Sequence, residues 1–199
     1  MTNYIIKFSL IALCFLIALC SRRFARSKED WAYLVAAMGL TLIADYFLVL
    51  AHNHRAGVFV FCFVHMVYIL RVSINRKETI RKIVSICAKG AIVLTLAMFL
   101  NLDILIVLTV IYAGLFIKNL VTHFKYCRFN RRLILTGLIL FALCDIHVLM
   151  FNLPRYIPAV PLAVAEWGRF WIWVFYTPAQ FLLSLSAADM HLQINPKRL

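Results

Sequence analysis

Two aspartates stand inside long apolar runs, where carboxyl groups are rare. Asp45 and Asp145 have mostly apolar neighbours on both sides. A charged side chain at the middle of a membrane helix costs about 2.5–3.5 kcal/mol on insertion scales, so such residues usually face the interior of a helix bundle and serve a function. Two carboxyl groups suit acid–base chemistry, because one donates a proton while the other accepts one. We therefore predict that the function of the protein sits at this pair.

Four further polar side chains lie in other apolar runs. His65 and Tyr68 are three residues apart, and Tyr176 and Gln180 are four residues apart. Both spacings place the two side chains of each pair on one face of a helix. We expect these four residues to face the interior of the bundle as well.

Depth counting places most of these groups at one level. At a rise of 1.5 Å per residue, Asp45 and Asp145 each lie roughly 10 Å below the outer ends of their runs, His65 and Tyr176 lie near 12 Å, and Gln180 lies at about 18 Å. A lone polar residue often serves only to hydrogen-bond helices together, with a contribution of around 0.6 kcal/mol. The matched depth on four helices favours a shared site.

Histidines and cysteines raise the alternative of a metal site. His52, His54 and His147 lie near the outer ends of their runs and, with the aspartates, could form a zinc site. The first two fall beyond the predicted helix end, and none of the six cysteines forms a CxxC pair. We expect no metal and no cofactor, and we keep a zinc-dependent lipid amidase as an alternative.

The elements that carry these residues are predicted to be membrane-spanning helices. Of the 199 residues, 64% are hydrophobic, whereas soluble proteins average about 45–50%, so the surplus must face lipid. Most of the apolar runs approach the roughly 20 residues that cross a bilayer. We predict one all-α domain over residues 1–199, with seven spans at 4–20, 31–50, 57–74, 83–100, 102–122, 133–152 and 167–188.

The connections between spans carry two further predictions. Residues 101–103 are expected to form a tight turn. Residues 154–166 contain Pro154, Pro158 and Pro161 and are predicted to form a loop, because proline removes a backbone donor and disrupts a helix interior.

Basic residues predict the orientation. The formal net charge is +13, and lysines and arginines concentrate in alternate connections, at 22–28, 71–82 and 118–132, and in the C-terminal tail. The opposite face carries only Lys7, Arg55, Arg155 and Arg169. Because basic loops stay in the cytoplasm, the N-terminus is predicted outside and the C-terminus inside. The charge is explained by topology and anionic lipid headgroups, so we do not expect nucleic acid as a partner.

At the polar positions the sequence resembles the YhhN family of lysoplasmalogenase-like membrane proteins. The resemblance covers residues 31–188 and rests on four short motifs, Ala44-Asp45, His65-Met66-Val67-Tyr68, Cys144-Asp145 and Tyr176-Thr177-Pro178-Ala179-Gln180. Three departures stand out. Ala44 replaces a family glycine, Cys144 replaces a family serine, and the family commonly has eight spans rather than seven.

The resemblance implies an activity. Family members hydrolyse the vinyl ether of lysoplasmalogens to a fatty aldehyde and a glycerophospho-base. Here Asp45 and Asp145 would act as acid and base, with His65, Tyr68, Tyr176 and Gln180 orienting water or binding substrate oxygens. The lysophospholipid would come from the membrane, and we expect a bacterial inner membrane. A small transporter or lipid-binding protein whose aspartates carry protons is the non-enzymatic alternative.

Overall fold

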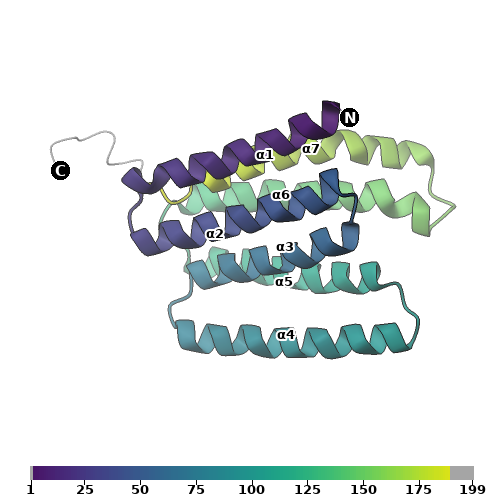
Figure 1. Cartoon of the computed structure of the whole chain (residues 1–199), viewed down its shortest axis with the longest axis horizontal. Coiled ribbons are helices and arrows are strands. Elements are labelled where there is room, and N and C mark those ends of the chain that lie inside the picture. Colours follow the sequence, from purple (N-terminus) through teal and green to yellow (C-terminus); the bar gives the residue numbers. More distant parts are fainter. Residues whose placement is uncertain (1, 189–199) are drawn as a thin grey trace.

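Seven α-helices run side by side along one axis (Figure 1). The computed structural model describes residues 2–188 and contains no strand among them, which confirms the all-α prediction. A short 3₁₀ helix, η1 (Ser21–Phe24), precedes α2, and a π-helical turn, η2 (Tyr46–Leu50), follows it. The helices are α1 (Thr2–Cys20), α2 (Lys28–Asp45), α3 (His54–Arg71), α4 (Arg76–Phe99), α5 (Ile104–Tyr126), α6 (Arg131–Tyr156) and α7 (Leu162–Ser184).

Six of these helices, α1 to α6, are long and apolar enough to cross a membrane. Helix α7 is 23 residues long but is less apolar, because it includes Glu166, Arg169 and several tryptophans. It nevertheless packs along α6 more extensively than any other pair of helices packs. Six of the seven predicted spans are confirmed as candidate spans in the described residues, and α7, which was predicted as the seventh, is not among them. The chain is therefore a multi-pass membrane protein, and its orientation stays a prediction.

Six helices form a closed ring, and the seventh lies outside it. In the ring order α1, α2, α3, α5, α6 and α7, each helix contacts the next, and α7 returns to α1. Helix α4 packs against α5 and α3 from outside and lies at one edge of the molecule (Figure 1). Helices α5 and α6 make the least contact of any neighbours in the ring. We call their junction the α5/α6 seam.

Glycines allow α6 and α7 to approach closely at two places. A Cβ on Gly168 of α7 would lie 2.6 Å from the carbonyl oxygen of His147, and one on Gly137 of α6 would lie 3.0 Å from Leu183. Small residues at such positions let membrane helices pack backbone to backbone. The α6–α7 pair is thus locked together at both ends.

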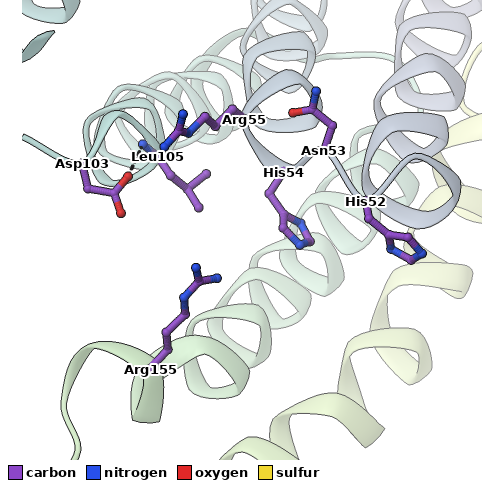
Figure 2. A pocket seen from close by; sticks show the side chains of 7 residues that line it. All are labelled: His52, Asn53, His54, Arg55, Asp103, Leu105 and Arg155. Carbon is purple, nitrogen blue, oxygen red and sulfur yellow. Dashed lines mark hydrogen bonds between the residues drawn. The ribbon is translucent and has the colours of Figure 1, made fainter.

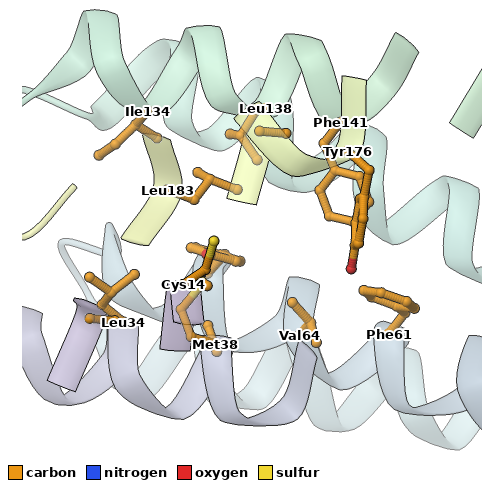
Figure 3. Packing of buried hydrophobic residues seen from close by; sticks show 14 of the residues in the cluster. Cys14, Leu34, Met38, Phe61, Val64, Ile134, Leu138, Phe141, Tyr176 and Leu183 are labelled. Atoms are coloured by element: carbon orange, nitrogen blue, oxygen red, sulfur yellow. The ribbon is translucent and has the colours of Figure 1, made fainter. Parts of the chain in front are cut away.

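The ring encloses the main hydrophobic core. Side chains of α1, α2, α3, α6 and α7 meet there, and Figure 3 shows Cys14, Leu34, Met38, Val64 and Leu183 among them. Helix α4 buries only its Ala97 side chain. The ring interior is therefore the place where polar groups escape lipid.

Two predictions about the connections have different outcomes. The tight turn is confirmed, since α4 ends at Phe99 and α5 begins at Ile104. The loop at 154–166 was predicted too long, because α6 continues to Tyr156 and α7 starts at Leu162. Proline is tolerated at helix ends: Pro154 lies in the last turn of α6, and Pro161 is the residue that caps α7.

Arg71 departs from its predicted place in a basic loop. It lies in the last turn of α3, and its side chain is buried. Its Nε and Nη2 donate to the two carboxylate oxygens of Asp30 at 2.8 and 2.9 Å, and its Nη1 donates to Ser186 Oγ at 2.7 Å. This ion pair joins α2, α3 and the segment after α7.

We predict that Arg71→Ala lowers the free energy of unfolding by about 3 kcal/mol, because it leaves Asp30 without its partner. Chemical unfolding in mixed micelles measures the loss. Arg76→Ala is the matched control, since Arg76 pairs with Glu29 in an exposed position and should change stability by less than about 1 kcal/mol. Equal losses in the two variants would contradict a structural role for the buried pair.

Candidate functional site

Asp45 closes α2 and faces the ring interior. Its side chain is 3% exposed, and Tyr176 Oη of α7 donates to its Oδ2 at 2.6 Å. The π-helical turn η2 begins directly after it, where Ala51 N donates to Tyr46 O at 2.9 Å. Such turns occur often at functional sites, because the added residue reorients the side chains around it.

Asp145 lies on α6 at the α5/α6 seam. Tyr112 Oη of α5 donates to its Oδ2 at 2.7 Å. Both side chains are only partly buried, in contrast to the enclosed Asp45–Tyr176 pair. Because α5 and α6 make little other contact, this hydrogen bond is a principal link across the seam.

The two aspartate–tyrosine pairs belong to one cluster. Two rings connect the pairs. The Phe141 ring lies 5.5 Å from the Tyr176 ring and 5.8 Å from the His65 ring, and the His65 ring lies 5.1 Å from the Tyr112 ring, between centroids. Four helices of the ring thus bring two carboxyls and two phenols together.

His65 reaches the same cluster from α3 and is fully buried. Asn119 Nδ2 of α5 donates to its Nδ1 at 3.2 Å, which leaves the ring proton on Nε2. The ring lies 5.1 Å from the Tyr112 ring and 5.8 Å from the Phe141 ring, between centroids. Within residues 2–188, His65 Nε2 and Asn119 Oδ1 find no hydrogen-bond partner.

Tyr68 and Gln180 lie one turn further along their helices. Tyr68 Oη contacts Met38 Sδ at 3.7 Å, and its ring packs against His123. Gln180 is 1% exposed, and both polar atoms of its side chain lack partners in the described part of the chain. The geometry therefore joins Asp45, Asp145, His65 and Tyr176 directly and leaves Tyr68 and Gln180 at the edge of the cluster.

Three members of this polar interior were missed by the sequence reasoning, and all belong to α5. Tyr112 and Asn119 are seven residues apart, and His123 follows four residues later. These spacings place all three on one helix face. A tyrosine in an apolar run is usually read as packing material, but this periodicity was a signal that the face is polar.

The histidines of the zinc alternative do not converge on the aspartates. His147 Nδ1 contacts Leu143 O at 2.7 Å, and its ring packs against Trp171 and Phe175. His52 instead packs against Tyr4. Residues 2–188 contain no group of three or more histidine, cysteine, aspartate or glutamate side chains that could hold a metal ion.

The two substituted positions beside the aspartates have structural explanations. A Cβ on Gly57 of α3 would lie 3.2 Å from the Ala44 carbonyl oxygen. Gly57 therefore supplies from α3 the close approach that a glycine at position 44 would supply from α2. Cys144 is buried next to Asp145 on α6 and stands at the position of the family serine.

Comparison with known proteins identifies the family. The model of the YhhN family matches residues 2–187, a range that includes every residue of the polar cluster. No curated protein and no solved structure gives a significant match. With a match over nearly the whole chain, the protein belongs to the YhhN family.

Proposed function

We propose that the protein is an integral membrane hydrolase that cleaves the vinyl ether bond of lysoplasmalogens. One observation carries the proposal: two aspartates, each held by a tyrosine, share one cluster in the interior of the helix ring. Membership of the YhhN family, which is associated with lysoplasmalogenase-like function, supports the same reaction.

The reaction needs two carboxyl groups in opposite protonation states. One carboxylic acid delivers its proton to the alkenyl carbon distal to the ether oxygen, which produces an oxocarbenium ion. Glycosidases handle an ion of this kind with the same pair of groups. The other carboxylate takes a proton from water as the water oxygen bonds to the cationic carbon, and a hemiacetal forms.

The hemiacetal then breaks down to the products. Its carbon–oxygen bond to glycerol cleaves as the carboxyl that took the proton from water donates it to the glycerol oxygen, while the other carboxylate takes the hemiacetal hydroxyl proton. The fatty aldehyde and the glycerophospho-base are released. Each carboxyl has returned to its starting protonation state, so the reaction consumes one water and no other reactant.

The seam favours entry of a single-chain lipid from the membrane. Asp145 and Tyr112 are partly exposed where α5 and α6 make little contact, whereas Asp45 is enclosed. We assign Asp145 to first contact with the substrate for this reason.

Unpartnered polar groups next to the pair fit a substrate and a water molecule. Buried polar atoms in proteins are almost always hydrogen-bonded. His65 Nε2 and the Gln180 amide break this rule in the described chain. In the proposed complex His65 binds a glycerol oxygen and Gln180, one turn deeper, binds the hydrolytic water, which gives both residues the orienting role expected from the sequence.

We predict that Asp45→Asn and Asp145→Asn each lower kcat at least about a hundredfold, because general acid–base catalysis contributes that much or more. Aldehyde release from lysoplasmenyl-ethanolamine by purified protein is the measurement. Glu166→Gln, an exposed change on α7, is the control and should keep full activity. Full activity in either aspartate variant, with the protein folded, would contradict the proposed acid–base mechanism.

The two tyrosines allow a finer test. Tyr112→Phe and Tyr176→Phe each remove one hydrogen bond to a carboxyl and leave the ring in place. We expect kcat to fall roughly tenfold in each case, since a hydrogen bond to a charged group is worth about 1.5–3 kcal/mol. Tyr126→Phe removes an exposed hydroxyl at the end of α5 and should have no effect. If all three variants kept wild-type kcat, the tyrosines would be packing residues only.

A further inference from the structure

A pocket of about 440 Å³ opens at the end of the bundle where α1, α3, α5 and α7 begin (Figure 2). We call this end the Arg55 end. The turn between α2 and α3 supplies one wall, the start of α5 another, and the end of α6 a third. The lining residues are His52, Asn53, His54, Arg55, Asp103, Leu105 and Arg155.

The lining is rich in basic groups. Arg55 and Arg155 come from positions 100 residues apart and lie on opposite sides of the gap, with His54 to the right of the gap (Figure 2). Asp103 is the one carboxylate of the lining, and its Oδ1 accepts a hydrogen bond from Leu105 N at 2.9 Å. The sequence predicts only four lysines and arginines on this side of the membrane, Lys7, Arg55, Arg155 and Arg169. Two of these four line the same pocket.

The pocket lies along the same seam as the catalytic cluster. Leu105 precedes Tyr112 by seven residues on α5, and Arg155 follows Asp145 by ten residues on α6. At the helical rise these separations are about 10 Å and about 15 Å. A glycerophosphate unit together with the reach of an arginine side chain covers this span.

We propose that this pocket binds the phosphate group of the lysophospholipid, with Arg55 and Arg155 as its charged donors. The assignment rests on the proposed function for the identity of the lipid. Arginine suits the role because its planar guanidinium donates two parallel hydrogen bonds to phosphate oxygens. Asp103 pairs with the amine of the headgroup, so the pocket complements a phosphate that carries an attached cation.

Placing the phosphate here orients the whole substrate. The glycerol unit points along the α5/α6 seam toward Tyr112 and Asp145, and the alkenyl chain continues among the apolar residues that flank the seam. The ether bond then lies beside the carboxyls. The headgroup site sets which end of the lipid enters first, and the seam sets where the bond is cut.

Binding tests the site without turnover. The probe is an ester-linked lysophosphatidylethanolamine, which has no vinyl ether, titrated into the purified full chain in micelles. We expect Arg55→Gln and Arg155→Gln each to raise its Kd about tenfold, as the loss of a charge-assisted hydrogen bond implies. Arg169→Gln is the matched control, because Arg169 is exposed near the same end and does not line the pocket. Its Kd should not change.

Two further ligands identify what the site recognises. A monoacylglycerol with the same chain lacks phosphate, so its Kd should be equal in the wild-type protein and both arginine variants. Inorganic phosphate alone should bind far more weakly than the lysolipid. If phosphate bound as tightly, the pocket would be a free-anion site, and if the variants kept the wild-type Kd for the lysolipid, the pocket would not bind it at all.

These outcomes separate the two proposals. If the lysolipid binds through the arginines but no lysoplasmalogen releases aldehyde, the pocket stands and the hydrolase reaction fails. If aldehyde is released and the arginine variants change neither KM nor Kd, the reaction stands and the pocket assignment fails.

Discussion

The interior of a bilayer offers no hydrogen-bond partner, so every polar group at that depth must find one within the protein. The two aspartates of this chain meet the requirement through a tyrosine from a different helix, Asp45 through Tyr176 and Asp145 through Tyr112. The first pair ties α2 to α7, and the second ties α5 to α6. The groups expected to do chemistry are thus also groups that hold the ring closed.

The ring is unevenly closed. Glycines lock α6 onto α7, and Gly57 brings α3 close to α2, whereas the junction of α5 and α6 depends on few contacts beyond the Tyr112–Asp145 hydrogen bond. A lipid that enters sideways needs one junction that separates at low cost and others that do not move. Glycines supply such close packing between α6 and α7 and between α2 and α3, and within residues 2–188 none supplies it between α5 and α6.

Sequence reasoning located the residues whose presence in an apolar run is costly, and it did so for a physical reason. Asp45, Asp145 and His65 cannot face lipid cheaply, so an inward position follows from residue type alone. Tyr112 was missed because a tyrosine is tolerated in many membrane settings, and only its partner reveals its role. Arg71 was assigned to a loop because basic residues usually flank spans, yet its partner Asp30 lies 41 positions away.

The helix boundaries also include some features that neighbouring residues predict and others that they do not. The turn at residues 101–103 could be predicted from the sequence, because Asp103 caps the start of α5 through a local hydrogen bond. Pro154 was misread because its cost depends on where in the helix it falls, which the residue alone does not reveal. Local interactions could be predicted from neighbours in sequence, whereas pairings between distant segments, such as the ring order that leaves α4 outside, could not.

The exclusion of α4 from the ring also has an electrostatic consequence. Helix α4 carries the chain back to the Arg55 end while lying outside the ring. The ring neighbours α3 and α5 therefore run in the same direction, and so do α1 and α7. Four helices of the ring therefore start at the Arg55 end, and only α2 and α6 finish there. Each helix start carries roughly half a positive elementary charge and each helix end roughly half a negative one, so the backbone dipoles of the six leave a surplus of about one positive charge at that end. The backbone itself attracts anions to the mouth of the bundle before any arginine contributes.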